Sequence, residues 1–181
     1  MGERFMEKIV LATTSDVNLV AELYDSVNKY FEATENYCYP NWQTGKYPVL
    51  NDAQEAFNDK SLYVLKDDGK VLGSIIINNK QHPEYRRMPW IIQVSDQDVR
   101  TIHTLVVDPK LRNRGIGEKL VRFSIDLCRS DGAKTIRIDT HFRNIPARGL
   151  YTKCGFHSLG CQTAFVDGIE QKFDVLEYVL F

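Results

Sequence analysis

The most constraining feature of this sequence is the run from Leu105 to Leu120. An apolar stretch ends at Val107, Asp108-Pro109 turns the chain, and a basic loop with two glycines then opens an amphipathic segment. The first turn of a helix has unpaired backbone N–H groups at the positive end of the helix dipole, and both features favour a bound anion. The run therefore predicts a strand, a phosphate-binding turn and a helix.

The glycines of this turn, Gly115 and Gly117, let phosphate oxygens approach the backbone because they carry no side chain. Arg112 and Arg114 add positive charge beside them. A dinucleotide-binding fingerprint would need a small residue where Leu120 stands, and the chain lacks the Gly-Lys-Ser/Thr run of a Walker loop. The remaining pattern is Arg-x-x-Gly-x-Gly. The alternative without a ligand is a glycine-rich helix entry with solvated arginines.

Hydrophobic periodicity predicts strands and helices that alternate along the chain. The predicted strands cover 5–11, 62–65, 71–77, 100–107, 135–138, 156–165 and 173–180, and the predicted helices cover 14–31, 51–57, 115–129 and 146–155. Asp67-Asp68-Gly69 is hairpin turn chemistry, and Gly155 is expected to end the last helix in a left-handed conformation. Residues 78–97 read as a long loop with a strand extension expected at 90–92. A mixed sheet flanked by helices is the natural architecture.

The chain has 181 residues, which suits one domain, 1–181, with one sizeable core. Its net charge of -1 gives no global field for nucleic acid or an anionic membrane. No apolar stretch is long enough for a membrane helix or a signal peptide. The cysteines form no CxxC pair and the histidines have no metal-ligand spacing. We therefore expect a cytoplasmic protein with no metal, nucleic-acid or membrane partner.

A second block lies further along the chain, from Asn144 to Phe156. Its informative residues are Asn144, Ala147, Leu150, Tyr151, Lys153, Gly155 and Phe156. They match the pattern Asn-x-x-Ala-x-x-Leu-Tyr-x-Lys-x-Gly-Phe. With the Arg-x-x-Gly-x-Gly turn upstream, the sequence resembles the GNAT superfamily of acetyl-CoA-dependent N-acetyltransferases. The detailed match covers residues 100–156, and the first half keeps the order of elements but diverges in sequence.

This resemblance implies a fold and a co-substrate. The GNAT fold is an α/β fold with a central, mostly antiparallel sheet of about seven strands, splayed in a V and flanked by about four helices. Acetyl-CoA is implied as co-substrate in the cleft of the V. The residues implied to contact it are Leu105, Val106, Val107, Arg112, Asn113, Arg114, Gly115, Ile116, Gly117, Asn144 and Tyr151.

Acetyl transfer to an amine needs an acceptor for the amine's proton, donors for the oxyanion and a proton or hydrogen bond for the departing thiolate. The resemblance implies that Tyr151 lies near the sulfur, and an ordinary phenol suits the last role. The alternative is a tyrosine that packs the short helix onto the sheet. His103 shares a strand face with Leu105 and is a candidate base. A buried, hydrogen-bonded histidine is its alternative, and solvent is another route for the proton.

The aromatic loop at 37–48 lies where the family places acceptor contacts. Trp42 and Tyr47 are expected to line the acceptor site, where aromatic rings attract a cationic amine. Taken singly, each residue is slightly better explained by packing, Trp42 at the sheet edge and Tyr47 in a satellite core, whereas the loop as a whole is expected to line the acceptor site. Glu35, Asp52 and Glu84 give a weaker signal for a cationic acceptor.

The function expected from these residues is transfer of the acetyl group of acetyl-CoA to a primary amine of a small molecule or peptide. Direct attack in a ternary complex is expected, because nothing in the sequence activates a cysteine or serine. The alternative is a non-catalytic acyl-CoA-binding module. The resemblance also implies a possible homodimer.

Overall fold

The computed structural model describes residues 7–34, 41–166 and 168–181. Their contacts group them into two units, each of which is described by itself. The first unit holds 7–34, 42–77 and 103–120, and the second holds 41, 78–102, 121–166 and 168–181. Two elements, β4 (Val99–Val107) and α3 (Ile116–Ser130), contribute residues to both units.

The strands form one seven-stranded sheet in the order β1-β2-β3-β4-β5-β7-β6. The other strands are β1 (Lys8–Leu11), β2 (Leu62–Asp67), β3 (Lys70–Asn78), β5 (Thr135–His141), β6 (His157–Val166) and β7 (Ile169–Val179), and the other helices are α1 (Thr14–Ala33), α2 (Leu50–Asn58) and α4 (Ile145–Lys153). The β4–β5 pair is parallel, whereas β1–β2, β2–β3, β5–β7 and β6–β7 are antiparallel. The predicted mixed sheet with flanking helices is confirmed, and the V-shaped splay stays a prediction.

In the first unit, local chemistry sets the ends of the elements. Asp68 and Gly69 both adopt a positive φ, 46° and 74°, and form the two-residue turn between β2 and β3. At the start of α1, the Thr13 N–H donates to Asp16 Oδ2 at 2.8 Å. The other Asp16 oxygen pairs with Lys66 Nζ in β2 at 2.6 Å. This carboxylate therefore caps the helix and fixes it to the sheet.

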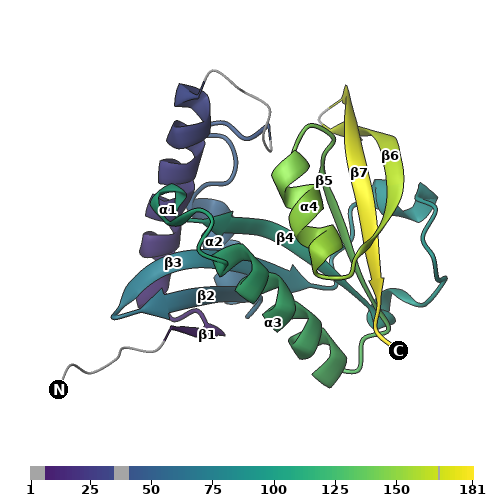
Figure 1. The fold of residues 1–181 in the computed structure, drawn as a ribbon, viewed down its shortest axis with the longest axis horizontal. Coiled ribbons are helices and arrows are strands. Elements are labelled where there is room, and N and C mark those ends of the chain that lie inside the picture. Colours follow the sequence, from purple (N-terminus) through teal and green to yellow (C-terminus); the bar gives the residue numbers. More distant parts are fainter. Residues whose placement is uncertain (1–6, 35–40, 167) are drawn as a thin grey trace. The chain divides into compact units, whose positions relative to one another are not determined.

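The core of the first unit lies between its helices and strands (Figure 1). α1 and α2 bury one face each against β2 and β3. The fully or nearly buried members are Val17, Val20, Leu23, Tyr24, Val27, Ala53, Ala56, Leu62, Val64, Ile76 and Val106. Because Val106 belongs to β4, this core supports the strand that precedes the predicted phosphate turn.

Gly73 of β3 lets α3, the helix that follows the predicted phosphate-binding turn, pack closely against the sheet. Gly73→Ala is therefore expected to destabilise the protein by about 1–3 kcal/mol. A Cβ at this position would lie 2.9 Å from the Val106 carbonyl oxygen and 3.0 Å from Leu120 Cδ1. Urea unfolding measures the loss. Gly149→Ala in α4 is the matched control, since its Cβ would meet nothing within 4 Å. Equal stability of the two variants would contradict the close packing.

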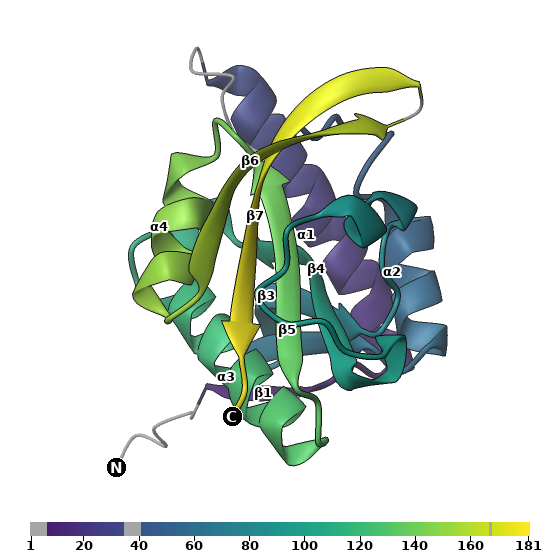
Figure 2. The ribbon, with the colours of Figure 1, turned by 90° about the vertical axis from the view of Figure 1, so that its right-hand side faces the viewer.

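The second unit is built on β5, β7 and β6, which lie side by side in that order (Figure 2). Residues 79–98, which we call the β3–β4 connection, include two 3-10 turns, Pro83–Arg87 and Asp96–Asp98. Its residues Tyr85, Met88 and Trp90 are buried with Ala164 and Val175 of the hairpin β6–β7. The segment predicted as a long polar loop therefore packs into an apolar cluster that it shares with the β6–β7 hairpin.

Some predictions need correction. The strand extension at 90–92 is wrong, because this backbone bends and its polar groups bond to side chains: the Ile91 N–H donates to Glu177, and the Ile92 carbonyl accepts from Arg137. The strand predicted at 135–138 continues to His141. Predictions for residues 5–6, for Glu35 and for 37–40 lie outside the described residues.

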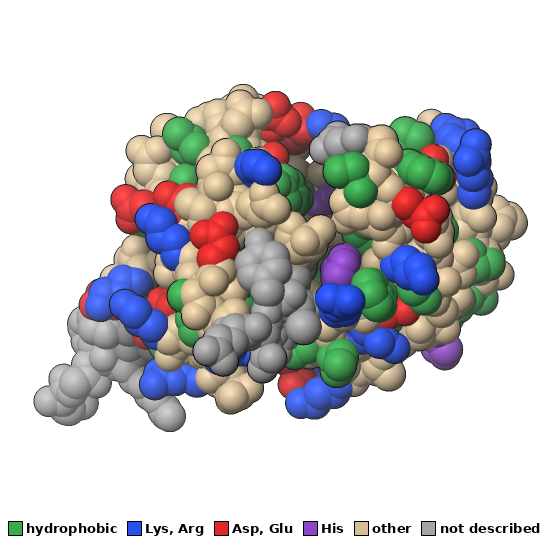
Figure 3. All heavy atoms as spheres, turned by 90° about the horizontal axis from the view of Figure 1, so that it is seen from above, with side chains coloured by type: hydrophobic (Ala, Val, Ile, Leu, Met, Phe, Trp, Pro, Cys, Tyr) green, Lys and Arg blue, Asp and Glu red, His purple; other side chains and the backbone are tan. Residues whose placement is uncertain are grey.

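The surface carries both signs of charge. Lys and Arg side chains occur together with Asp and Glu on the face drawn in Figure 3. Within the described ranges, no helix combines the length and apolar character needed to cross a membrane.

Candidate functional site

The predicted strand, turn and helix are present in the first unit. The Asp108 N–H bonds to the Leu72 carbonyl at 3.0 Å, and its carboxylate accepts the Lys110 N–H at 2.9 Å. A 3-10 turn, Pro109–Leu111, follows. The Gly115 carbonyl then accepts the Lys119 N–H at 3.0 Å, which is the first intrahelical bond of α3. The turn is thus fixed at both ends by backbone hydrogen bonds.

Gly115 has a positive φ of 78°, which a residue with a side chain adopts only at a cost. A Cβ built on it would meet nothing within 4 Å, so the space outside the turn is open. Residues 112–115 are exposed, whereas Ile116 is buried and anchors the helix. The N–H groups of this first turn have no partner inside the helix and carry its positive dipole end. The turn has the chemistry of an anion site.

The two arginines of the turn differ in their surroundings. Arg112 Nη1 donates to the Tyr30 hydroxyl at 2.9 Å, and its guanidinium lies 5.5 Å from the centre of the Tyr30 ring. Arg112 is therefore tied to α1. Arg114 is exposed and makes no hydrogen bond or ion pair with any residue that the structure describes. Arg114 is the better placed of the two to bind a ligand's charge.

Burial alternates along the end of β4. His103, Leu105 and Val107 are half-buried, while Thr104 and Val106 are buried. His103 and Leu105 share a burial class, but the left-handed backbone of Thr104 between them interrupts regular strand alternation, so their shared face stays a prediction. Thr104 has a positive φ of 43°, a strained conformation for a β-branched residue.

The described part of the aromatic loop is attached to the first unit's core. Asn28 Nδ2 lies 3.2 Å from the Tyr47 carbonyl and 3.4 Å from the carbonyls of Gln43 and Pro48. Trp42 packs against the core, and its ring meets Tyr47 edge-on at 5.9 Å. The Tyr47 hydroxyl lies 2.6 Å from Thr104 Oγ1, which ties the loop to the strained residue of β4. Packing therefore accounts for Trp42, and an acceptor contact by either ring stays a prediction.

The second predicted block forms α4 in the second unit. Asn144 is its N-cap, and its Oδ1 accepts the Ala147 N–H at 3.3 Å. Gly155 ends the helix with a φ of 98°, as predicted. Sequence reasoning missed the capping role of Asn144, although Asn before Pro at a helix start is a signal for it. A contact between Asn144 and the cofactor stays a prediction.

Tyr151 is 4% exposed, and its ring packs against Phe156 at 5.7 Å. Burial, and then the charges of Asp139 and Cys154, raise the pKa of Tyr151 well above its ordinary value of 10.0. Its hydroxyl makes no hydrogen bond with any described residue. The ordinary pKa assumed from the sequence is therefore wrong. Tyr151 therefore stays protonated. It can donate a hydrogen bond, but the raised pKa disfavours complete transfer of its proton.

Sequence reasoning missed Asp139, because the predicted strand ended one residue before it. Asp139 is half-buried on β5 and accepts a hydrogen bond from the Tyr85 hydroxyl at 2.7 Å. Burial, followed by the Asp139 charge, raises the pKa of Tyr85. Asp139 thus provides one carboxylate that acts on two protonated phenols, those of Tyr85 and Tyr151.

No metal centre is evident in the residues that the structure describes, since no three His, Cys, Asp or Glu side chains gather there. His141 follows Asp139 on the same face of β5, and its buried Nδ1 has no hydrogen-bond partner among the described residues. Burial, and then the charge of Arg143, lower the pKa of His141. Its imidazole is therefore neutral near pH 7.

Known proteins resemble this chain in sequence and fold. The family model described as "Acetyltransferase (GNAT) family" matches residues 5–156. An uncharacterized N-acetyltransferase of Methanocaldococcus jannaschii is 31% identical over 146 residues, which are 80% of this chain and 58% of the relative. Streptothricin acetyltransferase of Escherichia coli is 36% identical over 59 residues, which are 33% of this chain and 34% of the relative. The chain spans about half the length of two curated relatives that it matches, 44% and 58%.

Solved structures share the fold. The structure of yncA from Salmonella typhimurium, solved with its cofactor acetyl-CoA, has a TM-score of 0.69 at 16% identity and covers 97% of this chain and 94% of that chain. At this identity the likeness concerns the fold alone. The family model, in contrast, covers most of the sequence, including the glycine turn of α3 and the block around Tyr151. This chain belongs to the GNAT family of acetyltransferases.

Proposed function

We propose that this protein is an N-acetyltransferase that moves the acetyl group of acetyl-CoA to a primary amine by direct attack in a ternary complex. The observation that carries the proposal is the open, exposed turn at the start of α3, with its left-handed Gly115 and with Arg114, which pairs with none of the described residues. A diphosphate uses both features.

Binding is assigned to the first unit. The N–H groups of residues 112–117 and the Arg114 guanidinium would hold the pyrophosphate of acetyl-CoA. The backbone of Leu105, Val106 and Val107 would pair with the pantetheine arm, as the family resemblance implies. One N–H near Leu105 or Val106 would face the acetyl carbonyl, where a negative charge develops during attack. The residues present fit this cofactor, because the turn offers donors and positive charge without side chains in the way.

The chemistry needs a donor at the sulfur and an acceptor for the amine's proton. Tyr151 supplies the donor: its hydroxyl would hydrogen-bond to the thiolate as the carbon–sulfur bond breaks. The thiolate then takes a proton from solvent, and CoA leaves as a thiol. The attacking nitrogen loses a proton as the amide forms. His103 or solvent accepts this proton.

The acceptor class is a primary amine on a small molecule or a peptide. Streptothricin acetyltransferase, one of the relatives, is named for a small-molecule acceptor. A useful panel therefore contains streptothricin, spermidine, a peptide with a free N-terminal alanine and an N-terminally blocked lysine peptide. Release of free CoA thiol with acetyl-CoA and each amine measures turnover.

The turn can be tested by reversing one charge. Arg114→Glu is expected to weaken acetyl-CoA binding at least about tenfold, which corresponds to about 1.4 kcal/mol, because it puts a carboxylate beside the pyrophosphate. Isothermal titration calorimetry measures the Kd. Lys70→Glu changes the net charge equally at the exposed β2–β3 hairpin of the same unit and is expected to bind normally. Wild-type protein that binds no acetyl-CoA would refute the proposed function, and binding without turnover of any amine would favour an acyl-CoA-binding module.

A further inference from the structure

One face of β5 carries a row of polar side chains, Arg137, Asp139 and His141, at alternate positions. The residues between them, Ile138 and Thr140, are buried on the opposite face. The row begins at a fully enclosed guanidinium and continues to the half-buried carboxylate of Asp139. The β3–β4 connection contacts this row at two points, Arg137 and Asp139.

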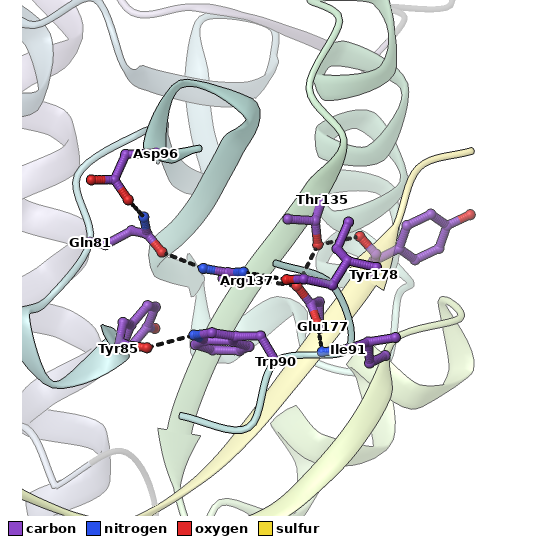
Figure 4. Close-up of polar contacts among 10 residues, drawn as sticks. Gln81, Tyr85, Trp90, Ile91, Asp96, Thr135, Arg137, Glu177 and Tyr178 are labelled. Carbon is purple, nitrogen blue, oxygen red and sulfur yellow. Dashed lines mark hydrogen bonds and ion pairs between the residues drawn. The ribbon is translucent and has the colours of Figure 1, made fainter. Parts of the chain in front are cut away.

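The first contact is a buried ion pair. Arg137 and Glu177 are cross-strand partners of β5 and β7, 5% and 0% exposed, and Arg137 Nε lies 3.1 Å from Glu177 Oε1. The remaining donors of Arg137 face the connection: Nη1 bonds to Gln81 Oε1 and Nη2 to the Ile92 carbonyl, both at 2.9 Å. Figure 4 shows Arg137 between Gln81 and Glu177, with both interactions drawn.

Glu177 completes the attachment from the other side. Its Oε2 accepts the Ile91 N–H, and its Oε1 accepts the Thr135 hydroxyl at 2.9 Å. The Trp90 ring lies against the Arg137 guanidinium, 4.6 Å from its Cζ. The ion pair therefore binds the backbone of two successive residues, 91 and 92, at a place where the chain forms no strand. Such a pair makes directional hydrogen bonds, which an apolar contact of the same size lacks.

The contact of the β3–β4 connection with Asp139 depends on its contact with Arg137. The Trp90 indole N–H donates to the Tyr85 carbonyl at 2.6 Å, and the two rings lie 5.0 Å apart. Trp90 thus links the attached residues to Tyr85, whose hydroxyl bonds to Asp139. A hydrogen bond from a hydroxyl restricts the orientation of a carboxylate. The chain of contacts runs from Glu177 through Arg137 and Trp90 to Tyr85 and Asp139.

We propose that Asp139 binds the acceptor amine as an ammonium ion, and that Tyr85, Arg137 and Glu177 are positioning residues that hold this carboxylate in place through the β3–β4 connection. The inference rests on the proposed function and names its substrate class: amines that arrive protonated. The Asp139 charge also acts on Tyr151, the predicted donor at the sulfur. An ammonium held at Asp139 loses one proton to water before attack, which leaves a neutral nitrogen nucleophile, and this nitrogen loses a second proton to His103 or solvent as the amide forms.

The test uses three variants of the full chain: Asp139→Asn, Tyr85→Phe and Gln81→Leu. At saturating acetyl-CoA, with the panel amine that wild type acetylates fastest, Asp139→Asn is expected to raise the amine KM about tenfold or more and Tyr85→Phe about threefold. Gln81→Leu removes one bond of Arg137 and is expected to raise both the amine KM and the hydrogen–deuterium exchange of peptides from residues 79–98. The Kd of acetyl-CoA should stay within about twofold of wild type in all three.

Matched controls come from the same unit. Asp126→Asn removes an exposed carboxylate on α3, and Tyr178→Phe removes a hydroxyl whose contact with Arg129 is 3.4 Å long. Neither should change the amine KM. An unchanged KM in Asp139→Asn, with wild type active, would overturn the inference and leave the proposed function standing. No acetylation of any amine by wild type would overturn both, and unchanged exchange in Gln81→Leu would overturn the positioning role alone.

Discussion

Tyr151→Phe is expected to lower kcat about a hundredfold or more, because a donor positioned at a leaving group contributes about 10²–10⁴-fold. The thiolate that departs from acetyl-CoA would lose its hydrogen-bond donor, while the pyrophosphate contacts at the α3 turn would remain. The Kd of acetyl-CoA is therefore expected to stay within about twofold of wild type. Release of free CoA thiol measures kcat, and calorimetry measures the Kd.

The pKa of Tyr151 sharpens this test. Burial raises it, so the phenol keeps its proton throughout the range in which an ordinary tyrosine titrates. Wild-type kcat should accordingly not fall near pH 10 through loss of this proton. Tyr178→Phe is the control, since it removes a hydroxyl from β7 of the same unit. Equal kcat in wild type and Tyr151→Phe would show that the residue only packs α4.

Local sequence signals predicted the parts of the fold that local chemistry determines. The Asp68-Gly69 turn, the left-handed Gly155 and the glycine turn of α3 each need a backbone conformation that few residues adopt, and each is found where predicted. These features depend on neighbours within a few residues, which a single sequence displays.

Features that depend on distant partners could not be predicted. Ile91 and Ile92 look like strand residues, but their backbone groups bond to Glu177 and Arg137, more than forty residues away in the chain. Asp139 became a candidate site residue only because the Tyr85 hydroxyl bonds to it, and Tyr85 lies in a segment that the sequence predicts as a polar loop. Tyr151 has a raised pKa because it is buried, and burial of one residue in a short helix is a property of the whole unit.

Glu177→Gln is expected to lower the free energy of unfolding by about 3–5 kcal/mol, because it leaves the Arg137 guanidinium buried without its counter-charge. Both side chains are almost fully enclosed, so water cannot replace the lost interaction. The Ile91 N–H and the Thr135 hydroxyl would also lose a charged acceptor. Urea unfolding followed by tryptophan fluorescence measures the change, with Asp126→Asn as the control for loss of an exposed carboxylate.

The double variant Arg137→Met, Glu177→Leu separates stability from position. Replacing a whole buried ion pair by apolar residues removes both charges together, so it is expected to recover most of the stability lost in Glu177→Gln. The two backbone attachments at residues 91 and 92 would remain absent. If the pair positions the β3–β4 connection, the double variant should be stable and still show rapid hydrogen exchange in residues 79–98. Slow exchange there would mean that the apolar packing of Tyr85, Met88 and Trp90 alone holds the connection, and that the charges contribute only to stability.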